Sequence, residues 1–263
     1  MLINFIIFLF FISLILSSKS QSKSKSISRI HNNMSKSNLF LGIKSSFLNE
    51  FNIILGSGSP RRKLILEEML NIPSSSITVI KPPFDEDLSK DNFKTASEYC
   101  LATAIEKSKS LSNDMIINHL QVKNNKKNLV ICSDTVVDLD GKVLEKPNDE
   151  NDAKIMLSKL SNREHKVHSS VVLSINGNIV KNFVSSTSVK FYHLNEIDIN
   201  SYVESQEPMD KAGSYGIQAI GSQLIESING DYYTVLVVMV VVVSSNSNYK
   251  IDNVSKYIRN DYL

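Results

Sequence analysis

The chain has 263 residues, of which 42% are hydrophobic and 21% are charged. These fractions are typical of a globular protein with a sizeable core, and they exclude a chain that is disordered throughout. No apolar run reaches the roughly 18 residues that a transmembrane helix needs. The two cysteines, Cys100 and Cys132, allow at most one disulfide and exclude a disulfide scaffold.

The charge is unevenly distributed along the chain. Residues 1–49 contain six basic residues and no acidic one, which leaves 23 basic and 27 acidic residues in the rest, a net charge of −4. Such a body is not expected to bind nucleic acid. Residues 2–16 are nearly all apolar, and residues 17–37 are rich in Ser and Lys. We expect residues 1–50 to be a leader outside the core, with three alternatives: a cleaved targeting segment, a membrane tether, or an extension upstream of a start at Met34.

The first predicted elements are a strand and a helix joined by a loop of small residues. Residues 52–55 are apolar and lead into the sequence GSGSPRR at 56–62. Ser59 is a good N-cap and Pro60 a good first helical residue, so we expect a helix that ends before Pro73. Free N–H groups and two guanidinium groups at a helix start can bind a phosphate. On spacing alone, a plainly capped helix or a Ser-Pro phosphorylation site fits as well.

A second helix and a longer strand follow. The sequence TASE at 95–98 is a capping-box pattern. The helix that it opens has Lys107 near the edge of an apolar face, which consists of Leu101, Ala104 and Ile105. Residues 113–128 are polar and indicate a surface loop or a helix tail. Residues 129–137 predict a strand that contains Asp134, which is either a metal-binding or water-orienting carboxylate or a turn-capping residue.

Hairpin signals divide the second half of the chain. The pairs Asp140-Gly141 and Asn176-Gly177 predict tight turns, and Asn162 suits a left-handed helix cap. Periodicity predicts helices over 149–160 and 196–204, and strands over 167–175, 179–184 and 188–192. The mixture of helices, strands and hairpins predicts an α/β fold with a mixed sheet.

Three further segments have residues that suit chemistry. Lys146 in the sequence EKP at 145–147 could return beside Asp134 after the hairpin, or be merely solvated. Residues 207–218 combine glycines with Gln218, which can donate and accept hydrogen bonds as base recognition requires, although an ordinary loop has the same composition. The acidic turn at 84–87 either supplies a metal carboxylate or is simply solvated. His165 and His168 lie on opposite faces of a predicted strand, so a shared metal is not expected.

Taken together, these segments resemble the Maf family of nucleoside triphosphate pyrophosphatases. The matching segments are GSGSPRR (56–62), FDE (84–86), SDTVV (133–137), DGKVLEKP (140–147), AKIMLSKLSNREHKVHSSVVL (153–173) and EPMDKAGSYGIQAIGSQLIESINGDYYTV (207–235). The sequences EKP and DKAGSYGIQ are similar to the branch that acts on dTTP and UTP, and to the Maf-like half of a eukaryotic fusion with a methyltransferase-like domain. The resemblance implies a two-lobed Maf/ITPase-like α/β fold over 51–235, around an elongated twisted mixed sheet, with the nucleotide in the cleft between the lobes.

The resemblance also implies the reaction and its residues. A nucleoside triphosphate and water would give the monophosphate and pyrophosphate, with Asp134 as the proton acceptor. Substrate choice would depend on Arg61, Thr135 and Gln218. The nucleotide would be bound by Ser57, Arg62, Lys107, Lys146 and Lys211. Glu86 and Asp134 would hold a divalent cation, Mg²⁺ or Mn²⁺.

The end of the chain departs from the family pattern. The family continues with a Gly-Leu/Phe-Pro turn and a final helix, whereas residues 236–243 are a largely β-branched apolar run that favours a strand. We therefore treat 236–263 as an atypical tail and keep a non-catalytic nucleotide-binding regulatory protein as the alternative function. The resemblance allows a homodimer. The expected location is the cytoplasm, with a secretory or membrane-tethered alternative through residues 2–16.

Overall fold

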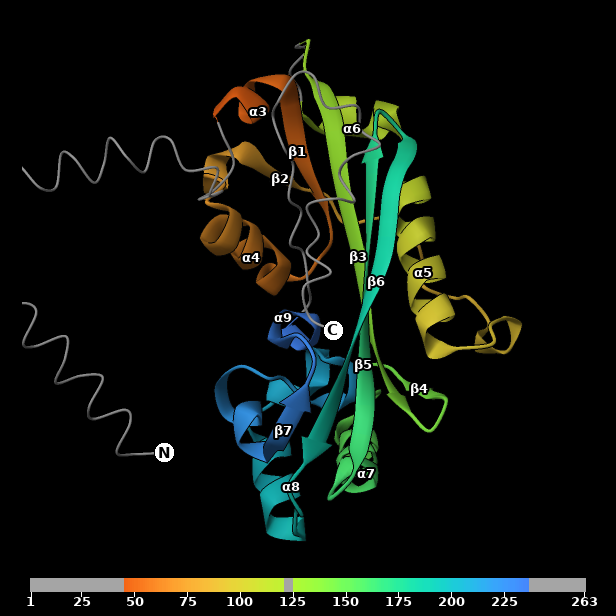
Figure 1. Cartoon of the computed structure of the whole chain (residues 1–263), viewed down its shortest axis with the longest axis vertical. Coiled ribbons are helices and arrows are strands. Elements are labelled where there is room, and N and C mark those ends of the chain that lie inside the picture. The colour runs from red at the N-terminus through yellow and green to blue at the C-terminus, as the bar shows by residue number, and fades with distance from the viewer. Residues whose placement is uncertain (1–44, 121–124, 237–263) are drawn as a thin grey trace, which may run out of the picture. The chain divides into compact units, whose positions relative to one another are not determined.

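The computed structural model describes residues 45–120 and 125–236, which form a mixed α/β structure (Figure 1). The strands are β1 (Phe51–Gly56), β2 (Ile77–Val79), β3 (Lys127–Leu139), β4 (Lys142–Leu144), β5 (Glu164–Ile175), β6 (Asn178–Phe191) and β7 (Ile225–Asn229). They form one sheet in the order β2-β1-β3-β5-β6-β7, with β4 paired to β3. Because β1 runs parallel to β2 and β3 while the other pairs are antiparallel, the predicted mixed sheet is confirmed.

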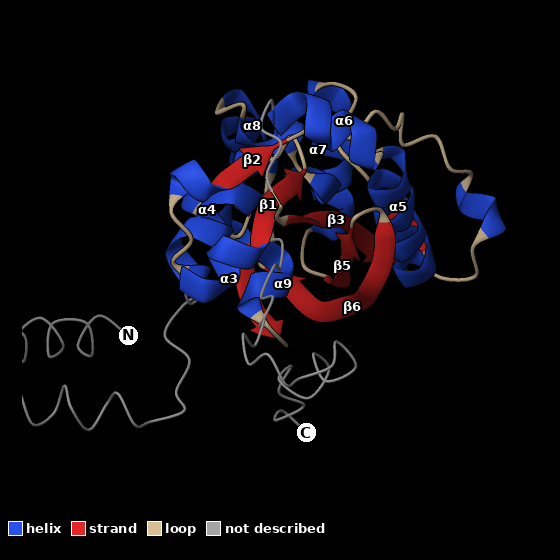
Figure 2. Ribbon diagram, turned by 90° about the horizontal axis from the view of Figure 1, so that it is seen from above, coloured by secondary structure: helices blue, strands red, loops and turns tan. Residues whose placement is uncertain are grey.

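Seven α-helices and five short 3₁₀ helices surround this sheet in the described residues. The α-helices are α3 (Ser45–Glu50), α4 (Pro60–Leu70), α5 (Ala96–Ser110), α6 (Asn113–Leu120), α7 (Glu150–Leu160), α8 (Glu196–Glu204) and α9 (Tyr232–Leu236). The 3₁₀ helices are η1 (Ser74–Ser76), η2 (Lys90–Asn92), η3 (Glu207–Asp210), η4 (Ala212–Ser214) and η5 (Ala219–Leu224). Helices α4 and α5 lie on opposite sides of β1 and β3 in both views (Figures 1 and 2).

The pairing of β3 is interrupted in the middle of the sheet. On one side, β3 pairs with β5 from Leu129 to Asp138. On the other side, β1 pairs with it as far as Cys132, and β4 begins to pair only at Val137. Residues 133–136 therefore have no partner strand on that side within the described part of the chain. This stretch of unpaired edge, between the two ends of the sheet, contains Asp134 and Thr135.

Two apolar clusters lie at the two ends of the long strands. The first packs α4 against β1 and the first half of β3, with Leu55, Leu66 and Ile131 at its centre. The second packs α7 and α8 against the other half of the sheet, around Leu157 and Phe191. Strands β3, β5 and β6 run through both halves (Figure 1). The two clusters are the cores of two lobes, as the resemblance implies.

Most local predictions hold because the signals are short-range. Both predicted hairpin turns have positive φ at both central residues: 53° and 80° at Asp140-Gly141, and 49° and 84° at Asn176-Gly177. These values suit the turn type that matches strand twist. Asn162 adopts the predicted left-handed conformation, with φ of 58°.

Five predictions need correction. Residues 45–50, expected to belong to a leader outside the core, form helix α3, and Phe47 is buried in the first apolar cluster because it packs with the residues of β1 and α4. The strands expected at 179–184 and 188–192 are one continuous strand, β6, because pairing with β5 continues across the polar residues between them. Residues 113–120 form helix α6, which buries Ile116. In α5 the buried face consists of Ala96, Tyr99, Cys100, Thr103, Ala104, Lys107 and Ser108, whereas Leu101 and Ile105 are half-buried. Ser59 occupies the N-cap position of α4, but its side chain makes no cap hydrogen bond.

Two sets of predictions lie outside the described residues. They concern the segment 2–16, and the strand expected over 236–243, of which only Leu236 is described, as the last residue of α9. In the ranges that are described, every helix is too short or too polar to cross a membrane.

Two residues of α7 allow a test of the packing in the second apolar cluster. Leu157 is fully buried, whereas Ile155 on the same helix is 51% exposed. We expect Leu157→Ala to lower the free energy of unfolding by about 3 kcal/mol, because it removes buried apolar surface and leaves a cavity. Ile155→Ala is the matched control and should cost less than about 1 kcal/mol. Urea denaturation of both variants measures this, and equal losses would contradict the assigned packing of α7.

Candidate active site

The open edge of β3 faces a cavity of about 780 Å³ between the two lobes. All ten residues predicted from the sequence line this cavity. They are Ser57, Arg61, Arg62, Glu86, Lys107, Asp134, Thr135, Lys146, Lys211 and Gln218. The fold thus brings together residues that are up to 161 positions apart in the chain, from Ser57 to Gln218. Their individual roles stay predictions.

A buried cation lies at the start of α4. Arg62 is only 8% exposed, and its Nη1 donates a hydrogen bond of 2.9 Å to Ser57 Oγ. The same Oγ accepts from the backbone N–H of Ser59 at 3.1 Å. Burial lowers the pKa of Arg62, although the charges of Asp134 and Glu86 oppose this. No carboxylate of the described residues lies within 4.0 Å of the guanidinium, and its Nε has no hydrogen-bond partner there. A buried charge without a counterion is costly, so this position favours an anionic ligand.

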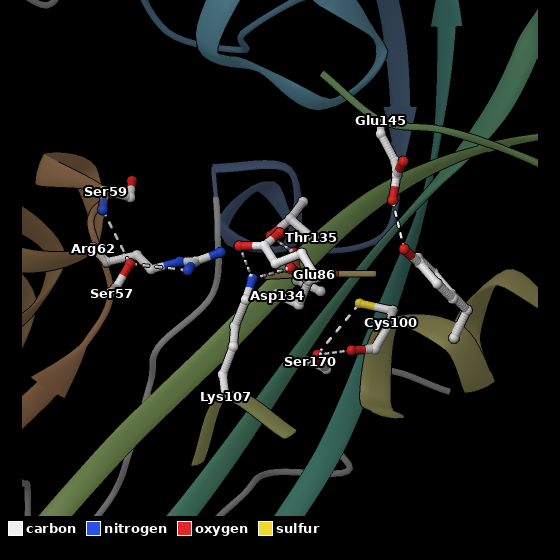
Figure 3. A network of polar contacts seen from close by, with 12 residues as sticks. Ser57, Ser59, Arg62, Glu86, Cys100, Lys107, Asp134, Thr135, Glu145 and Ser170 are labelled. Atoms are coloured by element: carbon white, nitrogen blue, oxygen red, sulfur yellow. Dashed lines mark hydrogen bonds and ion pairs between the residues drawn. The ribbon is translucent and has the colours of Figure 1, made fainter. Parts of the chain in front are cut away.

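A lysine connects two carboxylates at the open edge. Lys107 Nζ lies 2.7 Å from Asp134 Oδ1 and 3.0 Å from Glu86 Oε1. The side chains of Lys107 and Asp134 are 8% and 10% exposed, whereas Glu86 is half exposed. Burial raises the pKa of Asp134, and this is opposed by Lys107 and Arg62. Figure 3 shows Arg62 extending from the other side toward this pair, so cations flank Asp134 on two sides.

Thr135 is held on the opposite face of β3. Its Oγ1 lies 2.9 Å from Ser169 Oγ on β5, and Ser169 Oγ donates to the backbone carbonyl of Thr234 at 2.7 Å. The hydroxyl of Thr135 is therefore positioned by a cross-strand contact that is itself tied to α9. This arrangement limits the directions in which Thr135 can present its hydroxyl to a ligand.

The segment 207–218 docks against the β3–β4 hairpin. Gly213 has φ of 68° and its N–H donates to the carbonyl of Glu145 at 3.0 Å. A side chain at this position would meet Val137 Cγ2 at 2.7 Å, so both the backbone angle and the space require glycine. This docking brings Gln218 to the cavity wall. The segment is a series of 3₁₀ turns rather than the ordinary loop that was the alternative.

One ion pair connects the two lobes across the cavity, and a second one shares its carboxylate. Arg61 Nη1 of α4 lies 3.7 Å from Asp210 Oδ1 of η3, and Lys211 Nζ lies 2.6 Å from the same oxygen. Burial raises the pKa of Asp210, but Lys211 and Arg61 outweigh it and the net shift is downward. Asp210 is therefore ionised at neutral pH and pairs with two cations that could also bind phosphate.

Three polar residues of the cavity lie outside all the motifs that the sequence analysis singled out: Lys81, Tyr99 and Thr103. The Tyr99 hydroxyl donates to Glu145 Oε1 at 2.5 Å, and Lys90 Nζ donates to the other oxygen of Glu145 at 2.7 Å. Burial and this hydrogen bond raise the pKa of Tyr99. Tyr99, Thr103 and Lys107 recur every four residues, so a polar stripe on α5 was the signal that could have found the first two.

The donor atoms near Asp134 suit a divalent cation in part. Asp134 and Glu86 provide carboxylate oxygens, which Mg²⁺ and Mn²⁺ prefer. Both already accept hydrogen bonds or ion-pair contacts from one cation, Lys107, so the space between them favours positive charge. Among the described residues no group of three or more His, Cys, Asp or Glu side chains is placed to hold a metal. A metal here would depend on substrate phosphates and water for its remaining ligands, as Mg²⁺ commonly does.

The two histidines of β5 have separate partners. His165 Nε2 lies 2.7 Å from the Tyr215 hydroxyl in a cluster with Phe191, and the ring is buried. His168 contacts Ser186 at 2.7 Å and Asp138 at 3.4 Å. This agrees with their predicted positions on opposite faces of the strand.

The fold and the cavity define an α/β protein with a cation-rich cleft between two lobes of one mixed sheet. The chain belongs to the Maf-like protein family, whose family model matches residues 52–238, as the sequence motifs predicted.

Several relatives have names that describe an activity. The chain is 42% identical over 188 residues to the dTTP/UTP pyrophosphatase of Clostridium perfringens, which covers 70% of this chain and 89% of that protein. It is 36% identical over 184 residues to the dTTP/UTP pyrophosphatase of Bacillus cereus, and this match covers 70% of this chain and 87% of that protein. It is 39% identical over 191 residues to a probable bifunctional dTTP/UTP pyrophosphatase/methyltransferase protein of Homo sapiens, and it spans only 30% of that longer protein. Among solved structures, a HAM1 protein from Coxiella burnetii matches 66% of this chain and 89% of its own, with a TM-score of 0.34 and 14% identity.

The buried His165 predicts a pH dependence of stability. Burial lowers its pKa from 6.5 to about 4. Between pH 6.5 and about pH 4, His165 therefore binds a proton in the unfolded chain but not in the folded one. The free energy of unfolding thus falls as the pH drops through this range, by up to roughly 3 kcal/mol. We expect His165→Gln to flatten the plot of unfolding free energy against pH in this window. The exposed His193 gives the matched control, His193→Gln, which should keep the wild-type slope. Parallel curves for wild type and His165→Gln would contradict the assignment.

Proposed function

We propose that this protein hydrolyses nucleoside triphosphates, with dTTP and UTP as preferred substrates, to the monophosphate and pyrophosphate. The observation that supports this best is the buried Arg62 guanidinium, which faces the cavity with no carboxylate within 4.0 Å in the described residues. A triphosphate supplies the missing negative charge. The relatives named dTTP/UTP pyrophosphatase, at 36–42% identity, support the same reaction.

The triphosphate would bind where helix α4 begins. Here the free N–H groups of the first turn and the guanidinium groups of Arg61 and Arg62 converge on one space. Ser57 holds Arg62 in place through its hydroxyl. Lys146 and Lys211 add positive charge from the other lobe. Neutralising the phosphates makes attack by water on phosphorus easier, since negative charge on the triphosphate repels the nucleophile.

Asp134 would accept the proton of the attacking water. The water oxygen bonds to the α-phosphorus, its proton goes to Asp134, and the bond from that phosphorus to the bridging oxygen breaks to release pyrophosphate. Burial raises the pKa of Asp134, which makes it a better base than an exposed aspartate. Lys107, 2.7 Å away, fixes the carboxylate in position.

A divalent cation would be held by Glu86 and Asp134. When bound, it neutralises phosphate charge and lowers the pKa of bound water. The two carboxylates would have to release Lys107 at least in part, because they share that ammonium group. The protein side chains would then fix the cation beside the reacting phosphate.

Base selection would involve Thr135, Gln218 and the open edge of β3. Uracil and thymine present two carbonyl acceptors and one N–H donor, and an amide with both a donor and an acceptor can pair with such an edge. The positions of Thr135 and Gln218 are set by the contact with Ser169 and by the docking of residues 207–218. A site whose polar groups pair with one base leaves them unpaired with another, and this is a strong source of discrimination.

Replacement of Asp134 tests the reaction. We expect wild-type protein with Mg²⁺ to release pyrophosphate from dTTP and UTP faster than from CTP, GTP or 7-methyl-GTP. Asp134→Asn should lower kcat by at least about 100-fold, because the amide cannot accept the proton. The matched control is Asp114→Asn, since Asp114 is exposed on α6 and does not line the cavity. A wild-type protein that is folded, binds nucleotide and releases no pyrophosphate would contradict the proposal and favour the regulatory alternative.

Replacement of Glu86 tests the metal site. We expect Glu86→Gln to raise the Mg²⁺ concentration for half-maximal activity by about tenfold or more, because one of two carboxylate ligands is lost. Titration calorimetry with Mn²⁺ in the presence of dTMP gives a readout that does not need turnover. Asp85→Asn is the control, since the adjacent Asp85 is exposed and does not line the cavity. Unchanged metal affinity in Glu86→Gln would exclude Glu86 as a ligand.

A further inference from the structure

We propose that Lys81 is an additional ligand for the substrate, and that it binds the two phosphates that leave as pyrophosphate. The inference rests on the proposed function, because it assigns a further contact to the same triphosphate. Lys81 lines the cavity with the ten predicted residues, and its side chain is exposed to the solvent in the cleft.

The sheet places Lys81 near the segment 56–62, which joins β1 to α4 and is proposed to bind the phosphates. Strands β1 and β2 are parallel, with Leu55 opposite Val79. Ile80 directly follows β2. Its N–H donates to the carbonyl of Leu55 in β1 at 3.0 Å, which keeps the ends of the two strands together. Lys81 directly follows Ile80, so it leaves the end of β2 at the same end of the sheet at which Ser57 leaves the end of β1. Ligands of α/β sheets bind at this carboxyl end of parallel strands.

The backbone around Lys81 is restricted. Lys81 precedes Pro82, and a residue before proline is confined to extended conformations. Pro82 is buried and Pro83 follows it, so the φ angles of two further residues are fixed. The segment therefore holds the Cα of Lys81 in one place, while the side chain remains free to turn toward a ligand.

The ion pairs of the cavity leave Lys81 without an acidic partner. Arg61 and Lys211 share Asp210, and Lys107 contacts Asp134 and Glu86. By contrast, neither Lys81 nor Lys146 has a carboxylate within 4.0 Å among the described residues. Together with Arg62, these are three cavity cations that no carboxylate contacts among the described residues, so they are available to an anionic ligand.

The strand order indicates which phosphates Lys81 meets. Across the sheet the order is β3, β1, β2: Asp134 lies on β3, Ser57 directly follows β1, and Lys81 lies two residues beyond the end of β2. If the α-phosphorus lies beside Asp134, a triphosphate that follows this row extends its β- and γ-phosphates toward Lys81. The monophosphate product does not reach that far.

Titration calorimetry with pyrophosphate and with dTMP, without turnover, tests this assignment. We expect Lys81→Ala to weaken pyrophosphate binding by about tenfold, the loss typical of one charge-assisted hydrogen bond, and to leave dTMP binding unchanged. In turnover, KM for dTTP should rise by a similar factor, with kcat within about twofold. Lys81→Arg should restore pyrophosphate binding. The matched control is Lys63→Ala, since Lys63 lies on α4, pairs with Glu67 and does not line the cavity.

Two results would overturn the assignment. One is wild-type affinity for pyrophosphate in Lys81→Ala. The other is an equal loss of pyrophosphate and dTMP binding, because this would mean a general disturbance of the cleft. The turnover of wild-type protein is a separate measurement: its absence would contradict the proposed function, and the pyrophosphate titration would still decide on Lys81.

Discussion

The gap in the pairing of β3 is the constraint on which the candidate site depends. A strand buried in a sheet has its backbone groups paired on both sides and has little room for a ligand along its edge. Here β1 ends at Gly56, opposite Cys132, and β4 reaches only as far as Leu144, opposite Val137, so residues 133–136 are open on one side while β5 pairs with them on the other. The strand is thus fixed by its pairing with β5, and yet Asp134 and Thr135 can reach a substrate. Every other part of the site is arranged around this opening.

Charge balance is the second constraint. Six cations and five carboxylates line one cavity, and most of them neutralise each other before any ligand binds. The pairs keep the buried groups charged, since isolated charges would be costly to bury. They also hold cations where phosphates would bind. The excess over the whole lining is one positive charge (6 − 5 = +1). Three of the cations, Arg62, Lys81 and Lys146, nevertheless have no carboxylate within 4.0 Å in the described ranges, so each can pair with an anionic group of a ligand.

Much of this could be predicted from the sequence, and the reasons are local. Hairpin turns such as Asn176-Gly177 and the left-handed cap at Asn162 depend on a few neighbouring residues, and the structure has both. The ten predicted cavity residues came from motifs whose resemblance to a family covers most of the described chain. What could not be predicted depends on pairing across the sheet. Neither the continuity of β6 nor the place of Lys81 in the wall of the cavity follows from any single segment, because each depends on pairing with a neighbouring strand.

The continuity of the long strands also bears on how the cleft would work. In many two-lobed proteins a hinge closes the lobes on the ligand. Here β3, β5 and β6 run through both lobes, and their ladders are paired across the level of the cavity. The distance from Asp134 to Arg62 is thus set by strand pairing and by the packing of α4, rather than by a flexible connection. Donors and cations that are already in position need little reorganisation when charge develops on the phosphates, and such preorganisation is usually the largest contribution to catalysis by polar sites. The rigidity of the sheet and the chemistry proposed for the cleft are therefore two consequences of the same strand pairing.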